Sequence, residues 1–336
     1  MKTDNLDLSV IIATYNRAGM ICRAIDSVIS QLTMDDEIIV IDDGSTDRTE
    51  EALNNFKDRI IYRRISHGGA GRARNEGIEI ARTPLIGFLD SDDEWIPGKM
   101  KLQRALLKAR PDVLFCFSDL AYRYSSGMEQ HRLLSYFNKD ALIGEHILGP
   151  GIPFSSIAPL PEGYNDFMVH IGDLYGKQME KELVQVNTLI YRRGTKQEED
   201  PKFPEDLPTR EDWEFVGKLA RKRLAAYLDC ETSWVYRHDG AQLTKLEYIT
   251  FLEARIKLLE RVWGADTEYL KDHREKYLTV HNHVHKSLIR EFLCLGRPQE
   301  ARKEIRKNID IPMKYKLLSH FPGFMNRYIF KLREVF

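Results

Sequence analysis

The 336-residue sequence predicts an α/β fold in which a mostly parallel sheet carries helices on both faces, followed by a C-terminal helical extension. Three observations predict it. Short runs of β-branched residues alternate with segments of helical periodicity up to about residue 120. Acidic residues directly follow several of these runs. Beyond Gln242 the apolar spacing becomes that of long helices. We therefore expect an α/β domain over residues 1–242 and a helical extension over 243–336.

The first third of the chain shows the alternation most clearly. Strands are expected over residues 8–14, 37–41, 59–65, 84–89 and 113–117. Helices are expected over residues 20–29, 47–56, 70–81 and 99–108, each opened by turn or cap residues. Because parallel strands need a crossover connection, this order predicts a parallel sheet.

The middle of the sequence is less regular. Residues 123–176 are interrupted by Gly, Pro and Ser, which predicts long irregular segments facing a substrate. Order returns with a strand over 183–191, a helix over 213–224 and a last strand over 232–236. Beyond it, an apolar stripe runs from Leu246 to Trp263 at spacings of three and four residues, which indicates a helix.

Composition excludes several classes of protein. Fifty Lys and Arg residues balance 51 Asp and Glu residues, giving a net charge of -1, which argues against a nucleic-acid-binding protein. The four cysteines form no CxxC pair, so neither a zinc cluster nor a disulfide framework is predicted. Acidic residues precede the first apolar run, which is the wrong charge order for a signal peptide. We expect a cytoplasmic protein.

Carboxylates gather where two predicted strands end. Asp90, Asp92 and Asp93 lie in the segment FLDSDDEW, and Asp42-Asp43-Gly44 follows the strand over 37–41. Ligands bind at the carboxyl ends of strands in open parallel sheets, and hard oxygen donors suit Mg²⁺ or Mn²⁺. Carboxylates also accept from nucleobase N–H groups and ribose hydroxyls. The alternative for both motifs is a helix-capping acidic turn.

The segment HGGAGRARNEG resembles a dinucleotide-binding fingerprint only in part. Arg74 stands where that fingerprint requires its third glycine, so a nicotinamide enzyme is not predicted. Arg72 and Arg74, near a helix start, either meet phosphate groups or are solvated surface arginines.

Five segments in this order resemble family 2 glycosyltransferases with the Rossmann-like GT-A fold. They are SVIIATYNRAGMICRAIDSVISQ, IIVIDDGSTDRTEE, GGAGRARNEGIEIARTPLIGFLDSDDEWIPGKM, REDWEFVGKLA and YRHDGAQLT. The resemblance covers about residues 8–244 and leaves out the last 90 or so. It implies an inverting glycosyltransferase that uses a nucleoside-diphosphate sugar, with uracil as the favoured base.

The resemblance also implies roles for individual residues. Asp212, in the Glu211-Asp212 pair, would be the catalytic base, and Asp92 would hold a divalent cation, Mn²⁺ or Mg²⁺. The expected nucleotide-sugar-binding residues are Thr14, Tyr15, Asp43, Arg74, Asp90, Ser91 and His238. Thr14, Tyr15 and Asp43 would line the base with Arg74 near it, Asp90 would approach the ribose, and His238 would help to hold the diphosphate or metal.

The acceptor is expected to be a hydroxyl group, on a saccharide or on a lipid-linked saccharide of surface-polysaccharide synthesis. Physical chemistry agrees, because a hydroxyl is a weak nucleophile and needs a carboxylate to take its proton. Two alternatives stay open: a metal-dependent nucleotidyltransferase, which would release pyrophosphate, and a nucleotide-sugar-binding protein without catalysis.

Two C-terminal features have competing interpretations. In a helix only His281 and His285 of the tract His281–His285 share a face, and the apolar neighbours favour a packing face over a metal site. The tail from Met313 to Phe336 interleaves basic and aromatic residues. It is either a peripheral membrane contact at the inner face of the membrane or a helix packed on its own domain or on a second subunit.

Overall fold

The computed structural model describes residues 6–140, 142–194, 199–221, 223–237, 248–307 and 310–333. The chain forms two compact units. Unit 1 comprises Met1–Glu205 and Glu211–Gly240, and unit 2 comprises Asp206–Arg210 and Ala241–Phe336. The expected domain boundary at residues 242–243 lies outside the described residues.

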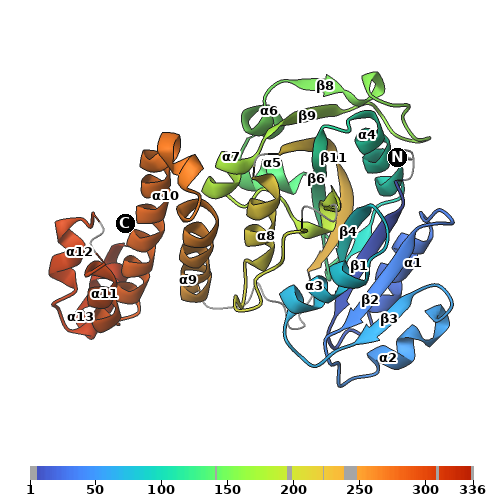
Figure 1. The fold of residues 1–336 in the computed structure, drawn as a ribbon. Coiled ribbons are helices and arrows are strands. Elements are labelled where there is room, and N and C mark those ends of the chain that lie inside the picture. The colour runs from blue at the N-terminus through green and yellow to red at the C-terminus, as the bar shows by residue number, and fades with distance from the viewer. Residues whose placement is uncertain are drawn as a thin grey trace. The chain divides into compact units, whose positions relative to one another are not determined.

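Unit 1 is built on one mixed sheet with the strand order β3-β2-β1-β4-β10-β6-β11-β9-β8 (Figure 1). Its strands are β1 Leu8–Thr14, β2 Glu37–Asp42, β3 Ile61–Arg64, β4 Leu85–Asp90, β6 Val113–Tyr124, β8 Gly151–Pro153, β9 Met168–Asp173, β10 Ile190–Arg192 and β11 Leu224–Arg237. Strands β3, β2, β1 and β4 are parallel to one another, and so are β6 and β11. Strand β10 is antiparallel to both β4 and β6, and β9 is antiparallel to β11. The short strands β5 Glu94–Trp95 and β7 Glu129–Gln130 pair with β11 and β6.

Helices cover both faces of this sheet. They are α1 Ile21–Ile29, α2 Thr49–Ala52, α3 Ala70–Ile80, α4 Lys99–Ala109, α5 Leu133–Asn138, α6 Ile143–Leu148, α7 Tyr175–Glu180 and α8 Glu211–Ala220. Short 3₁₀ turns lie at Leu53–Phe56, Phe154–Ser156 and Val186–Thr188. The predicted α/β fold of the GT-A type, a mostly parallel sheet with a C-terminal helical extension, is confirmed.

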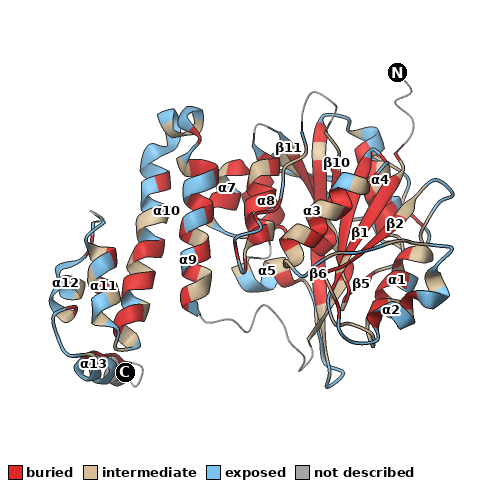
Figure 2. Cartoon of the chain, turned by 60° about the horizontal axis from the view of Figure 1, so that its bottom comes forward, coloured by how far each residue is buried: buried red, intermediate tan, exposed pale blue. Residues whose placement is uncertain are grey.

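Successive residues of β1 pack on opposite faces, as the two-residue period of a strand requires. Val10 and Ile12 belong to the apolar core that also includes residues of α1 and α4. Ile11 faces α3, and a Cβ at Gly77 would overlap its side chain. All three β1 side chains are fully buried, and Figure 2 shows the central strands as buried along most of their length. This double burial explains why the sequence of β1 is continuously apolar.

The structure corrects the sequence analysis in the middle of the chain. Residues 123–176, expected to be irregular, contribute strands β8 and β9 at one edge of the sheet and helices α5 and α6. The strand expected over 183–191 is reduced to β10. The strand expected over 232–236 is the end of the 14-residue strand β11, which begins at Leu224. Register shifts between Leu228 and Trp234 break the alternation that a sequence pattern depends on.

Unit 2 is helical. It contains α9 Tyr248–Leu259, a π-helical turn at Glu260–Gly264, α10 Thr267–Cys294, α11 Pro298–Ile305, α12 Met313–Leu318 and α13 Gly323–Arg333. The predicted apolar stripe is buried from Ile249 to Trp263, while Leu246 lies outside the described residues. Within the described part of the chain, no helix combines the length and apolar character that crossing a membrane requires.

Candidate active site at the carboxyl ends of the parallel strands

The strand order reverses at β1. The chain adds β2 and β3 on one side of β1 and then returns to place β4 on the other side. Thr14 at the end of β1 pairs with Asp42, and the preceding Ala13 pairs with Asp90. The carboxyl ends of three neighbouring parallel strands therefore meet at a topological switch point, where open α/β sheets bind their ligands.

A stacked aromatic pair lies beside a carboxylate at this edge. The rings of Tyr15 and His67 stack with their centroids 4.3 Å apart, and Tyr15 is 40% exposed. The Asp43 carboxylate lies 2.9 Å from Nδ1 of His67 and accepts from the backbone N–H groups of Gly68 and Gly69, both at 2.8 Å. Each carboxylate oxygen can accept a second hydrogen bond. A flat ring beside an acceptor suits a nucleobase.

The sequence analysis missed His67. It stands directly before Gly68-Gly69, and its role depends on contacts with residues more than 20 positions away. The other aspartate of the Asp42-Asp43 pair serves the backbone: the buried Asp42 accepts from the Ser45 N–H and the Tyr62 hydroxyl. Asp42 thus stabilises the turn that the alternative interpretation expected, although helix α2 has no side-chain cap; ligand binding by Asp43 stays a prediction.

Arg74 links the two acidic motifs. Its guanidinium donates to the Asp90 carboxylate at 2.8 Å and to the Glu211 carboxylate at 2.8 Å. Its side chain is only 7% exposed. Burial opposes the charge of Arg74, but the attraction of Asp90 and Glu211 outweighs it and raises the arginine pKa. The structure thus places Arg74 between the end of β4 and the start of α8.

The four residues that follow Leu89 have different surroundings. Asp92 is partly exposed and lies 3.4 Å from Nε of Arg17, while Ser91 is buried. Asp93 is buried and accepts from the Asn187 side chain at 2.5 Å and the Tyr236 N–H at 2.9 Å. Burial, together with the charges of Asp92 and Asp90, raises the pKa of Asp93 well above its usual range. Asp93 therefore anchors β11, and Asp90 and Asp92 are the carboxylates that solvent reaches.

Asp92 contributes one partly exposed carboxylate, which faces Nε of Arg17 at 3.4 Å, as an oxygen donor for a divalent cation. In the described part of the chain, none of these aspartates belongs to a group of three closely spaced metal-binding side chains. Magnesium typically uses one or two carboxylates and completes its shell with water and substrate phosphate. A single accessible carboxylate oxygen donor at Asp92 meets that requirement.

Asp212 lies in the first turn of α8. Its carboxylate accepts from the N–H of Trp213 at 2.8 Å, and Asp212 is half-buried. Neighbouring contacts fix the helix. Trp213 donates through its indole N–H to the Gln178 carbonyl at 2.6 Å, and Phe215 stacks on Phe203 at 4.0 Å. With Glu211 held by Arg74, the position of Asp212 is set relative to the end of β4.

The last predicted segment is described only in part. Arg237 places its guanidinium 4.1 Å from the centre of the Tyr122 ring. His238, expected near the diphosphate or metal, lies outside the described residues.

Known glycosyltransferases resemble this chain in sequence. The sequence profile of Glycosyl transferase family 2 matches residues 9–156. WfaP of Escherichia coli, a UDP-Glc:alpha-D-GlcNAc-diphosphoundecaprenol beta-1,3-glucosyltransferase, is 40% identical over 114 residues, which are 33% of this chain and 45% of WfaP. EpsJ of Bacillus subtilis, an uncharacterized glycosyltransferase, is 24% identical to this chain. The match covers 94% of this chain and 87% of EpsJ.

A solved structure resembles nearly the whole chain. The crystal structure of S. aureus TarS 1-349 in complex with UDP-GlcNAc has a TM-score of 0.58 at 17% identity and covers 93% of this chain and 90% of that one. At this identity the likeness shows the fold. The chain spans less than half the length of WfaP. The resemblance expected from the sequence is confirmed: residues 9–156 match the profile of glycosyl transferase family 2, and the chain shares the fold of TarS.

Proposed function

We propose that the chain is an inverting glycosyltransferase that moves a sugar from a UDP-sugar to a hydroxyl of a saccharide or a lipid-linked saccharide. One observation carries the proposal. Arg74 ties Asp90, at the end of β4, to Glu211, the residue before Asp212, through two hydrogen bonds of 2.8 Å. A carboxylate that can act as a base is thereby held beside the strand ends where a nucleotide binds.

The chain's own residues would bind the nucleotide and accept the proton of the acceptor hydroxyl. Tyr15 and His67 offer a stacked surface for the base, and Asp43 offers acceptors beside it. Asp212 accepts the proton of the acceptor hydroxyl while the new bond to the anomeric carbon forms. The bond to the diphosphate breaks on the opposite face, so the anomeric configuration inverts. The leaving group is a nucleoside diphosphate.

We assign the cofactor to Asp92. A Mn²⁺ or Mg²⁺ ion bound there would neutralise negative charge on the diphosphate. In the structure Nε of Arg17 lies 3.4 Å from the Asp92 carboxylate, so an ion bound at this oxygen would compete with the guanidinium for it. Replacing Asp92 with Asn is expected to weaken metal-dependent binding of UDP, because the amide oxygen carries no charge.

The names of two similar proteins support the choice of substrates. TarS has been solved with UDP-GlcNAc, and the name of WfaP gives UDP-Glc as donor and a diphosphoundecaprenol-linked sugar as acceptor. We carry over the class of donor, a UDP-sugar, and the class of acceptor. The particular sugar and linkage would be set by the segments between residues 123 and 185.

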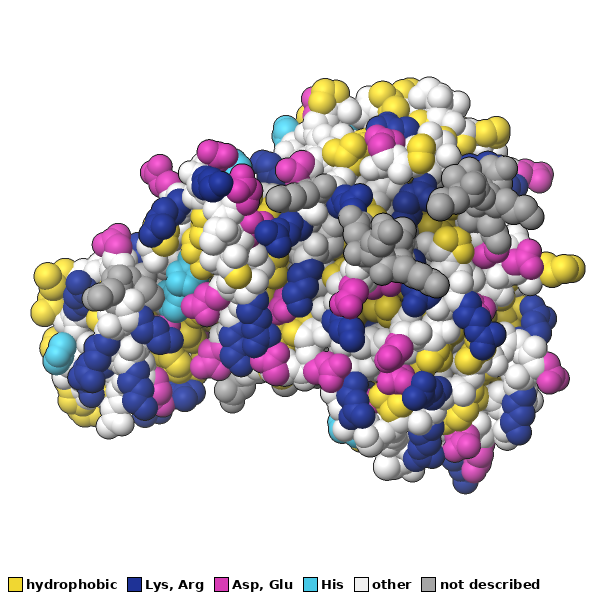
Figure 3. All heavy atoms as spheres, in the orientation of Figure 1, with side chains coloured by type: hydrophobic (Ala, Val, Ile, Leu, Met, Phe, Trp, Pro, Cys, Tyr) yellow, Lys and Arg dark blue, Asp and Glu magenta, His cyan; other side chains and the backbone are white. Residues whose placement is uncertain are grey.

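A lipid-linked acceptor would lie at a membrane surface, and unit 2 offers a matching feature. Leu317, Phe324 and Tyr328, on α12 and α13, are 61%, 69% and 66% exposed, and the exposed basic residues Lys316 and Arg327 directly precede two of them. Figure 3 shows Lys and Arg side chains beside hydrophobic ones over the C-terminal helices. We include peripheral contact with an anionic membrane, at its cytoplasmic face, in the proposal.

Vesicle co-sedimentation tests the membrane contact. We expect the full chain to bind phosphatidylglycerol-containing vesicles and to bind them less after Phe324→Ser with Tyr328→Ser. Met128→Ser, which changes an exposed residue of unit 1, should leave binding unchanged. Equal binding by all three proteins would contradict the contact. Self-association that the double substitution abolishes would instead indicate an oligomer formed through the C-terminal helices.

Product analysis tests the reaction. With a UDP-sugar, a divalent cation and an acceptor panel, the proposal predicts release of UDP. Release of pyrophosphate from a nucleoside triphosphate and a sugar phosphate would indicate a nucleotidyltransferase. UDP-sugar binding without turnover on any acceptor would indicate a binding protein.

Asp212→Asn tests the assignment of the base. The change keeps the shape and removes the proton acceptor, so kcat should fall about 10²- to 10⁴-fold while the affinity for UDP stays unchanged. Asp35→Asn, on the exposed loop before β2, is the matched control and should keep full activity. Undiminished kcat in Asp212→Asn would contradict the assignment.

A further inference from the structure

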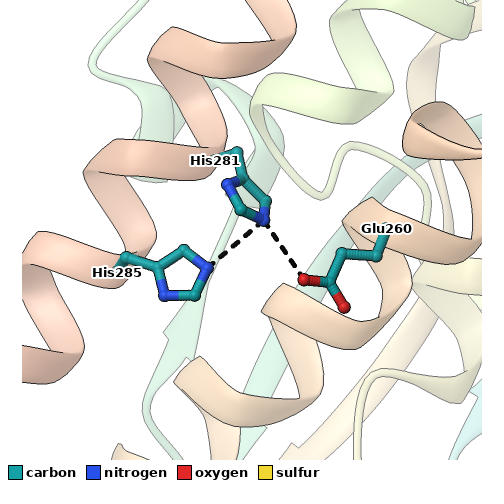
Figure 4. Close-up of side chains that lie close together, drawn as sticks. All are labelled: Glu260, His281 and His285. Carbon is teal, nitrogen blue, oxygen red and sulfur yellow. Dashed lines mark hydrogen bonds and ion pairs between the residues drawn. The ribbon is translucent and has the colours of Figure 1, made fainter. Parts of the chain in front are cut away.

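Three ligand-type side chains of unit 2 converge between α10 and the π-helical turn at Glu260–Gly264 (Figure 4). They are Glu260, His281 and His285, and their nearest ligand atoms all lie within 4.8 Å of one another. Nε2 of His281 lies 3.2 Å from Nε2 of His285 and 3.4 Å from a carboxylate oxygen of Glu260. As predicted, His281 and His285 share a helix face, but the sequence analysis favoured a packing role and did not include Glu260.

We propose that Glu260, His281 and His285 form a Zn²⁺ site that links the turn after α9 to α10. The spacing fits this ion. Zinc lies 2.0–2.1 Å from histidine nitrogen in tetrahedral sites, which places neighbouring ligand atoms about 3.3 Å apart. Two of the three separations, 3.2 Å and 3.4 Å, match that distance, and the third lies within 4.8 Å. A ligand set of two imidazoles and one carboxylate also suits zinc better than it suits magnesium or calcium.

The surroundings hold the buried ligand in the required form. Nδ1 of His285 donates to the Glu304 carboxylate of α11, so its Nε2 atom, which faces His281, is left as the acceptor. Lys307 in turn holds Glu304 at 2.8 Å. A histidine that donates its second ring N–H to a carboxylate is the usual outer arrangement of a zinc site, because it fixes the tautomer and the ring orientation.

The other histidine is also held as a ligand. The Tyr277 ring stacks on His281 with centroids 5.4 Å apart. Nε2 of His281 thus faces two other ligand atoms at once, Nε2 of His285 and a carboxylate oxygen of Glu260.

The backbone around Glu260 adds an independent indication. Helix α9 changes from α-helical to π-helical geometry at this residue. Such turns insert one extra residue into a helix and occur frequently at functional sites. The Glu260 side chain is 55% exposed while His285 is 2% exposed, so solvent reaches the cluster from the side of Glu260. The three protein ligands and Glu304 would cross-link three helical segments.

Calorimetric titration of ZnCl₂ into the full-length chain at pH 7.5 tests the site. The measurement is made on Asp92→Asn, so that the proposed donor-site cation does not contribute. We expect one zinc ion per chain and a higher melting temperature with zinc. His281→Gln and Glu260→Gln should each weaken zinc binding by about tenfold or more. Excess Mg²⁺ should not compete.

His283→Gln is the matched control, since His283 lies on the same helix, is exposed and stands outside the cluster. It should bind zinc as tightly as the parent, which is the Asp92→Asn chain without a further substitution. Glu260→Gln, at an exposed position, keeps the test valid if His281→Gln is unstable. Absence of saturable zinc binding, or equal affinity in the parent and Glu260→Gln, would overturn the proposal. Because the readout is metal binding, the result does not depend on glycosyl transfer.

Discussion

The strand-end site of unit 1 and the histidine cluster of unit 2 hold their polar groups in different ways. In unit 1 the Arg74 guanidinium supplies a fixed positive charge to Asp90 and Glu211. In unit 2 the imidazole rings of His281 and His285 and the Glu260 carboxylate face one another through nitrogen and oxygen atoms. The first arrangement is satisfied by the chain itself, whereas the second is best satisfied by an added cation.

The difference teaches what each site needs in order to keep its shape. Buried charges are stable when a partner of opposite charge and good geometry is present. The carboxylates beside the proposed donor site have that partner before any ligand binds, so the site is preorganised. The cluster in unit 2 should gain order and stability only with its ion.

Removing the fixed cation of unit 1 should have the largest effect on stability. Arg74→Met leaves Glu211 buried and Asp90 partly buried without a counter-charge, and we expect the free energy of unfolding to fall by about 3–5 kcal/mol. Arg74→Lys should recover only part of this loss, because one ammonium cannot reproduce two planar donors. Urea titration followed by tryptophan fluorescence measures the change.

Arg72 provides the control on the same helix. Its guanidinium donates to the Ser66 carbonyl at 3.3 Å, so Arg72→Met should cost less than about 1 kcal/mol. If Arg74→Met proved as stable as Arg72→Met, the bridge between the two acidic motifs would not be a stabilising feature of the site.

Lys99 offers a contrast to Arg74 within unit 1. It is also a buried basic group, but its hydrogen bonds go to neutral oxygens. Its ammonium nitrogen donates to the Thr188 carbonyl at 3.0 Å and lies 3.1 Å from the Thr232 hydroxyl. Burial lowers the pKa of Lys99 to about 7. Between this value and the ordinary lysine pKa, the unfolded chain binds a proton that the folded chain does not. The contribution of Lys99 to the free energy of unfolding therefore rises with pH between these two pKa values.

The test compares the wild-type chain with Lys99→Met, so that other titrating groups cancel. Relative to the variant, the wild-type chain should gain up to about 1.4 kcal/mol per pH unit as the pH rises from about 7 towards 10. Urea titrations at several pH values measure the slope. A difference that stays constant over this range would show that Lys99 is protonated in the folded chain.

A smaller effect is expected from the backbone beside Asp43. Gly44 has a φ of +79°, and a Cβ there would lie 3.1 Å from the backbone nitrogen of His67. Gly44→Ala should cost about 1–2 kcal/mol, because L-residues disfavour this conformation. It should also weaken UDP binding by moving His67. Gly19→Ala, where a Cβ meets nothing within 4 Å, should be nearly neutral in both assays; equal effects would contradict the account.

Several parts of this arrangement could be predicted from the sequence. Asp43, Asp90 and Asp92 follow continuous apolar runs, so their location at strand ends follows from local pattern alone. The bridge from Arg74 to Glu211 could not be foreseen, because it joins residues 137 positions apart. The edge strand β8 has only three residues, and β11 contains register shifts, so neither shows a regular period. Glu260 joins the histidine cluster only through helix packing.

The most direct measurement is thermal melting of the full-length chain with UDP, GDP, dTDP, ADP or CDP, each with Mn²⁺, with Mg²⁺ or with EDTA. We predict stabilisation by UDP only when a divalent cation is present, equivalent to about 2.7 kcal/mol at a ligand concentration 100 times Kd. The shift should be retained in Asp212→Asn and lost in Asp92→Asn. No stabilisation by any diphosphate, or an equal shift in Asp92→Asn, would contradict a metal-assisted nucleotide-sugar site at the strand ends.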